Sequence, residues 1–169
     1  MDVYARPPRL VIFNLNENEG YEVQFNPTQF EESLSVNYDR MDVMGLSHKP
    51  LQYNSTNNMV IKMDLFFLSQ DVPTHVSGLK VRRFLYSLCY APKNTKAIVS
   101  GQPPRALVVW PNTMSLTAKL TKLDISNTRF NIFGEITEFT ASVEFEEVMD
   151  VRWTSEDALA HGIQKGGLE

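Results

Sequence analysis

Apolar and polar residues alternate with a period of two along several stretches of the chain, which predicts β-strands with one buried face. The strongest example is residues 59–68, where every second side chain is apolar. Residues 9–15 and 21–25 are separated by an Asn-rich turn that ends in Gly20, so they predict a β-hairpin. A further strand is expected to begin near Glu32 and to continue to Tyr38.

The longest alternating segments are residues 114–125 and 139–148. They are joined through residues 130–134, where Gly134 can adopt a positive φ in a turn, so they predict a long hairpin. The short apolar run 106–110 is bounded by prolines and predicts a buried strand.

Helical spacing is clear in one segment, which starts near residues 74–77 and ends before Pro92. Its apolar residues recur at i, i+3, i+4 and i+7: Val81, Phe84, Leu85 and Leu88. This pattern predicts one amphipathic helix. Its polar side carries three basic residues: Lys80, Arg82 and Arg83. They form either a solvated helix face or a contact with another subunit.

The stretch FNPTQF, residues 25–30, interrupts the strands. Pro27 fixes its own φ, lacks a backbone donor and favours an extended Asn26, so a ladder that arrives at Phe25 has to end. We expect a turn here, with Phe25 and Phe30 anchored in the core on either side.

Residues 39–58 lose the alternation and predict a long loop. Five apolar residues are spaced along it: Met41, Val43, Met44, Leu46 and Leu51. A loop of this length is usually functional or disordered.

The pattern contains about seven or eight strands and one helix. It predicts a mainly β fold, an antiparallel β-barrel or sandwich with one flanking α-helix, because a sheet of this size has to protect its edges. The 169 residues fit one domain. We assign residues 1–150 to the β domain and residues 151–169 to a short tail.

The formal net charge of -4 supplies no basic field for nucleic acid, and no apolar stretch approaches the roughly 20 residues that span a bilayer. We therefore predict neither nucleic-acid binding nor membrane insertion. Cys89 is the single cysteine, which excludes an intrachain disulfide and suits synthesis in a reducing compartment.

Candidate chemistry is sparse. The histidines His48, His75 and His161 are too far apart for a metal-ligand pair. The neighbouring carboxylates of Glu31 and Glu32 point to opposite faces of a strand and cannot act as an acid–base pair. No nucleophile elbow, dinucleotide loop or phosphate loop occurs. We predict no catalytic residue, no cofactor site and no metal site, and we expect the protein not to be an enzyme.

Four segments form an ordered set that resembles a known family: FNPTQF at 25–30, GLSHKPLQYNSTNNMVIKMDLFF at 45–67, PPRALVVWP at 103–111 and RFNIFGEITEFTASVEFEEV at 129–148. Their order and spacing are similar to the tube-like domain of contractile injection systems, which occurs in myophage baseplates and phage-tail-like particles. The resemblance covers roughly residues 8–150. It implies a tail-tube-like β domain with a flanking helix.

The resemblance also implies a function. Family members form a hexameric ring that connects the central spike hub to the tail tube and initiates tube assembly. The implied partners are other copies of the chain, a spike hub protein, a tail tube or tube initiator protein, and baseplate wedge proteins. The implied location is a virion tail baseplate or a phage-tail-like particle, made in the bacterial cytoplasm.

In this family the loop at residues 39–58 would reach a neighbouring subunit or ring. The expected contacts are Met41, Val43, Met44, Leu46 and Leu51, together with the basic helix residues Lys80, Arg82 and Arg83. A loop that folds back over its own barrel is the alternative.

Many relatives carry a C-terminal LysM module, and residues 151–169 are too few to form one. The alternative functions are a tail tube subunit proper and a β-fold glycan-binding module; a hydrolase with scattered residues is less favoured.

Overall fold

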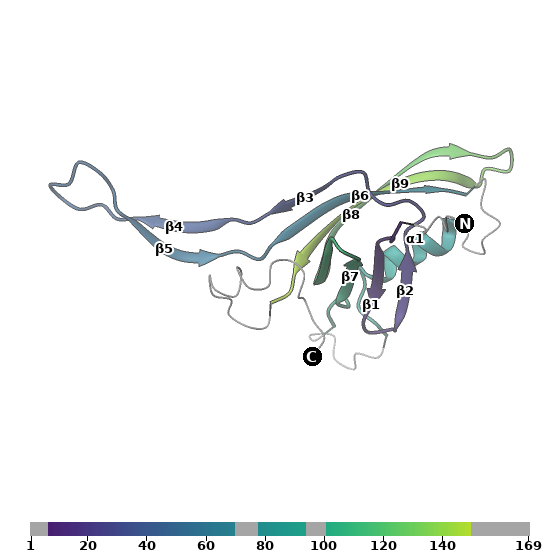
Figure 1. Cartoon of the computed structure of the whole chain (residues 1–169), viewed down its shortest axis with the longest axis horizontal. Helices are drawn as coiled ribbons and strands as arrows, with labels where there is room; N and C mark the ends of the chain where they lie inside the picture. The colour runs from purple at the N-terminus through teal and green to yellow at the C-terminus, as the bar shows by residue number, and fades with distance from the viewer. Residues whose placement is uncertain (1–6, 70–77, 94–100, 150–169) are drawn as a thin grey trace, which may run out of the picture.

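The computed structural model describes residues 7–69, 78–93 and 101–149. Within them lie nine strands and one helix, in the order β1 (Val11–Asn14), β2 (Glu19–Glu22), β3 (Phe30–Ser33), β4 (Val36–Arg40), β5 (Leu51–Thr56), β6 (Val60–Leu68), α1 (Gly78–Ser87), β7 (Ala106–Trp110), β8 (Met114–Phe130) and β9 (Ile136–Glu147). Seven strands form one sheet in the order β2-β1-β7-β8-β9-β6-β3, and β4 pairs with β5 in a separate ribbon (Figure 1). Every pairing is antiparallel.

The mainly β, antiparallel fold with one flanking helix is confirmed, but the sheet is open and not closed into a barrel. Strands β2 and β3 are its two edges. Each is four residues long, and between them Pro27 interrupts the chain, so they do not complete a ladder with each other.

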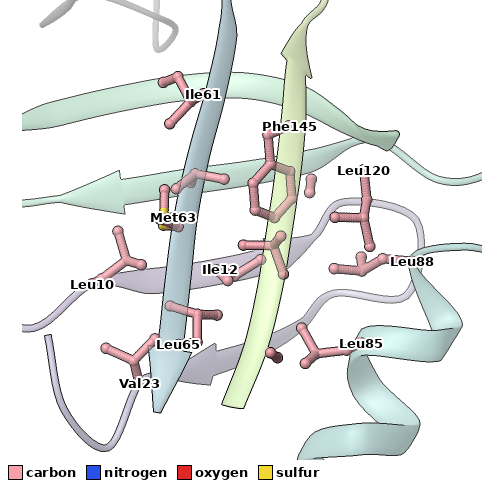
Figure 2. Packing of buried hydrophobic residues seen from close by; sticks show 14 of the residues in the cluster. Leu10, Ile12, Val23, Ile61, Met63, Leu65, Leu85, Leu88, Leu120 and Phe145 are labelled. Carbon is pink, nitrogen blue, oxygen red and sulfur yellow. The ribbon is translucent and has the colours of Figure 1, made fainter. Parts of the chain in front are cut away.

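The core lies inside the curl of this open sheet. The first hairpin crosses behind β6 and β9, and α1 covers the side of the cluster (Figure 2). Leu10 and Ile12 meet Ile61 and Phe145 there, and all four side chains are fully or almost fully buried. The alternation of β6 is therefore explained by one face toward this core and one face toward solvent.

The long C-terminal hairpin is confirmed, and it is longer than the pattern predicted. Strand β8 continues beyond residue 125 to Phe130, and its last five residues are exposed. The register shifts between Leu120 and Lys122, so the side facing the core passes from Leu120 to Leu123. The turn contains Gly134 with a φ of 78°, as the sequence predicts.

The helix is also confirmed. Val81, Phe84 and Leu85 are buried on one side of α1, and Leu88 is buried just after its end. Gly78 lies where the helix meets the stacked rings of Phe67 and Phe139. The predicted start at residues 74–77 lies outside the described residues, as does the tail from residue 150.

The FNPTQF stretch forms the predicted break, but one of its predicted core anchors is wrong. Asn26 holds the break to the first strand: its Oδ1 accepts a hydrogen bond from the backbone N–H of Leu10 at 3.0 Å. Phe30 is partly buried against Trp110. Phe25 is 45% exposed and contacts Phe66, which points away from the core, because the proline turn places Phe25 outside the sheet.

Candidate assembly surface

The predicted loop at residues 39–58 is part of a two-stranded arm: residues 51–56 form a strand, and residues 41–50 form an irregular tip, so the loop prediction is wrong for residues 51–56. Strands β4 and β5 pair from Val36 with Thr56 to Arg40 with Leu51, with a bulge beside Tyr38. The arm projects from one end of the molecule (Figure 1). Every residue of both strands is exposed. The predicted alternative, a loop folded back over its own barrel, is therefore wrong.

The two faces of the arm differ in polarity. On one face the ring of Tyr38 lies edge-on to the ring of Tyr53, with centroids 6.1 Å apart. Val36 and Leu51 lie on the same side of the ribbon, where Thr56 and Arg40 are their paired neighbours. Pairing and alternation place the side chains of Asn37, Asp39, Gln52 and Ser55 on the other face. No other described part of the chain covers the apolar face.

The tip of the arm carries most of the predicted contact residues. Met41, Val43, Met44 and Leu46 are all exposed there, and Leu51 begins β5 beside them. A hydrogen bond from the N–H of Leu46 to the carbonyl of Val43 closes the turn at 3.3 Å, and Gly45 has a φ of 89°. The Lys49 ammonium lies 2.5 Å from the Asp42 carboxylate. These apolar residues are exposed, and their contact with another subunit stays a prediction; the sequence analysis did not predict the ribbon that carries them.

The β8–β9 turn is a second projecting element, and the sequence analysis predicted the turn but assigned no contact to it. The β8–β9 turn displays three exposed apolar side chains at the end of the molecule opposite the arm: Phe130, Ile132 and Phe133 (Figure 1). Turns are usually polar, so three apolar residues beside Gly134 in a predicted turn were the sequence feature that could have indicated an exposed contact surface.

The structure does not bring the predicted basic residues to the arm. Lys80 and Arg83 are exposed on α1, far from the arm in Figure 1, and Arg82 is half-buried. The Arg82 Nε atom is buried and has no hydrogen-bond partner among the described residues. If the basic helix side contacts another subunit, it is a separate surface.

The outer face of the sheet is charged, and its charges are paired with one another. A shallow depression of about 250 Å³ lies over β6, β8 and β9. In it Lys62 lies 3.4 Å from Glu144, and the Ser142 hydroxyl donates a hydrogen bond to Asp64 at 2.5 Å. Nearby, Lys122 lies 2.8 Å from Asp124, and this partner raises the pKa of the lysine. The contacts of Lys62 with Glu144 and of Ser142 with Asp64 join β6 to β9, whereas Lys122 and Asp124 pair within β8.

Other chemistry is limited in the described ranges. They hold no group of three or more His, Cys, Asp or Glu residues placed to bind a metal ion. Burial raises the pKa of the Cys89 thiol, so it stays protonated at neutral pH. In the part of the chain with described coordinates, no helix has the length and apolar character needed to cross a membrane.

Two projecting elements hold apolar side chains away from the core, which is typical of surfaces that contact other molecules. The chain matches the model of a family described as contractile injection system tube protein over residues 12–153. It belongs to that family and is a structural component of a contractile injection system.

Among solved structures, the chain is similar to one from the cryo-EM structure of the anti-feeding prophage baseplate, 6-fold symmetrised. The two are 12% identical, the match covers 88% of this chain and 95% of that chain, and the TM-score is 0.40. No curated protein matches the chain.

Proposed function

We propose that this protein forms a hexameric ring in the baseplate, where it connects the central spike hub to the tail tube and initiates tube assembly. Family membership supports a structural role in the tail. The ring of six copies is what the resemblance of the four sequence segments implies. In this proposal the neighbours are a spike hub protein, a tail tube or tube initiator protein, and baseplate wedge proteins.

The observation that carries the proposal is the uncovered apolar face of the arm. A two-stranded ribbon on its own is marginally stable in water, and this one has every strand residue exposed. A face that carries Tyr38, Leu51 and Tyr53 gains stability when a second surface covers it. The proposed covering surface is an adjacent subunit or ring.

The basic residues of α1 are assigned a secondary role in the same assembly. Lys80 and Arg83 are exposed and present positive charge away from the core. We assign them to a contact with an acidic surface of a neighbouring subunit, where paired charges fix the orientation more than they add affinity.

The second candidate function is a tail tube subunit proper, which the description of the matching family favours. Such a subunit stacks into many identical rings, whereas the proposed adaptor forms a discrete ring. Both candidates use the same arm.

Purified protein distinguishes these functions. Light scattering measures the mass of the particles, and negative-stain electron microscopy shows their shape. A discrete ring with the mass of six chains supports the adaptor, and an extended tube supports the second candidate. A chain that remains monomeric at high concentration contradicts both. The location is tested by adding a spike hub protein and a tube protein separately, since an adaptor ring binds each on a different face.

A further inference from the structure

The arm meets the sheet at a short joint whose two chain segments differ in length. Residues 34–35 separate β3 from β4, whereas residues 57–59 separate β5 from β6. One extra residue on one side of a β-ribbon interrupts the ladder and bends it. The arm and the sheet are therefore two separate ladders that meet at a bend.

Only the sheet side of the joint is anchored in the core. The carbonyl of Met59 accepts a hydrogen bond from the N–H of Glu147 at 2.9 Å, and the Met59 side chain packs against the core cluster. The other four residues of the joint are exposed. A depression of about 470 Å³, lined mainly by hydroxyl and amide side chains, lies beside them. Among the described residues, apolar burial therefore secures the sheet side of the joint and not the arm side.

Asn57 supplies the hydrogen bonds that close the joint on the arm side. Its backbone N–H donates to the carbonyl of Ser35 at 2.9 Å, and its Nδ2 donates to Ser35 Oγ at 2.8 Å. Its Oδ1 accepts from Nδ2 of Asn37, in β4, at 2.9 Å. We call these three hydrogen bonds the clasp. The clasp links the segment before β6 to the segment that leads into β4.

A further contact ties the joint to the sheet. Asn58 Nδ2 donates to Glu146 Oε1, in β9, at 3.1 Å. The groups of the clasp lie on exposed residues, so water replaces their partners when the clasp opens, and the net cost of opening is small. The direction of the arm thus depends on a few bonds that open more readily than either ladder.

We propose that the clasp formed by Asn57 with Ser35 and Asn37 is a latch that fixes the direction of the arm. When the latch opens, the arm turns at the joint as an intact ribbon. A few residues at the ends of secondary-structure elements are where hinges absorb such changes. The proposal concerns the single chain and is independent of whether the chains form rings.

The distance between a spin label on the arm and one on the sheet measures the direction of the arm. In a Cys89→Ala background, the labels are attached at Gln52→Cys in β5 and Ser126→Cys in β8, both exposed positions. Labelled chains are diluted with an excess of unlabelled chains, so that only distances within one chain are recorded. We expect one narrow distance distribution with the clasp intact. Asn57→Ala keeps one of the three clasp bonds and is expected to broaden the distribution at least about twofold.

Two controls isolate the joint. Thr56→Ala removes a hydrogen bond to the Tyr53 hydroxyl, 3.0 Å long, that lies within β5 and does not cross the joint, so it should leave the distribution narrow. A label pair within the sheet, Glu17→Cys with Ser126→Cys, reports any distortion of the sheet itself and should be unaffected by Asn57→Ala. Asn37→Ala opens the clasp from the arm side and is expected to broaden the distribution as well.

Amide hydrogen exchange distinguishes an arm that turns from an arm that unravels. With Asn57→Ala, the N–H of residue 57 should exchange roughly tenfold faster, while the β4–β5 ladder keeps its protection. Loss of protection throughout β4 and β5 overturns the proposal, because the amides then hold the ribbon together and do not set its direction. Distributions equally narrow for Asn57→Ala, Asn37→Ala and Thr56→Ala overturn the latch. A distribution that is already broad with the clasp intact overturns it too, since the direction of the arm is then not fixed.

Discussion

The side-chain amide of Gln24 hydrogen-bonds both backbone polar groups of Leu68. Gln24 Nε2 donates to the Leu68 carbonyl at 2.9 Å, and Gln24 Oε1 accepts from the Leu68 N–H at 3.0 Å. Strand β3 pairs with β6 only from Val60 to Met63, so Leu68 lies beyond its reach. The Gln24 amide satisfies the two backbone groups of Leu68 that a neighbouring strand would otherwise bond. It thereby links the segment after β2 to β6, near the opposite edge of the open sheet.

Loss of this amide is expected to destabilise the fold. Gln24→Ala leaves two backbone groups of half-buried Leu68 without their partners, at a cost of about 1–3 kcal/mol in the free energy of unfolding. Chemical denaturation at a fixed protein concentration measures the change. Gln52→Ala, on the exposed polar face of the arm, is the matched control and is expected to have little effect. Equal stabilities for the two variants would show that the bridge contributes nothing.

The apolar face of the arm is expected to matter for assembly and not for folding of the subunit. Leu51→Ser combined with Tyr53→Ser removes apolar surface that no other part of the described chain covers, so subunit stability should change by less than about 0.5 kcal/mol per site. Assembly measured by light scattering should fall sharply. Gln52→Ser with Asp39→Ser changes the other face and should leave assembly intact.

Deletion of residues 43–51 is the more severe form of this test. The deletion removes the tip and the start of β5, and the sheet core contains none of these residues. We expect a folded monomer by circular dichroism that no longer forms rings or stacks. Normal assembly of the deletion variant rules out the arm as the contact.

Asn131 is expected to stabilise the β8–β9 turn. Asn131→Ala removes the three side-chain hydrogen bonds that fix the turn. The free energy of unfolding, measured by chemical denaturation, should fall by about 1–2 kcal/mol. Asn127→Ala, on the exposed part of β8, is the control for a general effect of the substitution. Equal stabilities for the two variants would show that the hydrogen bonds of Asn131 add nothing.

Elements with one buried face were predictable from the sequence, because burial creates the contrast between apolar and polar positions. Ile61, Met63 and Leu65 all face the core, as the alternation of residues 59–68 predicts. The same holds for the buried positions of β9, such as Phe139 and Phe145.

Strands without a buried face were not predicted, because exposure on both sides removes the contrast between apolar and polar positions. The last five residues of β8, which include Ser126 and Asn127, are exposed on both sides, so they show no alternation of apolar and polar positions. Strand β5 alternates weakly through Leu51 and Tyr53, but its remaining residues are polar, and the segment resembles a loop.

Closure of the sheet and the positions of the contact residues depend on long-range geometry. Whether β2 pairs with β3 is decided by the path around Pro27, which a local pattern does not specify. The apolar residues of the arm tip were identified from the sequence, but their place at the end of a projecting ribbon follows from the strand pairing alone.

Tyr21 is expected to make the fold sensitive to alkali. Burial raises the pKa of its hydroxyl from 10.0 to about 12, and its ring packs on Phe84. Between pH 10 and pH 12 the unfolded chain loses the Tyr21 proton while the folded chain keeps it, so the unfolded state binds fewer protons and stability falls as pH rises. This group lowers the free energy of unfolding by up to about 1.4 kcal/mol per pH unit.

Tyr21→Phe removes that contribution, and denaturation curves from pH 9 to pH 11.5 should show a flatter decline in stability for this variant than for the unchanged protein. Tyr90→Phe, at an exposed position, serves as the control. Parallel declines for the unchanged protein and Tyr21→Phe would refute the assignment.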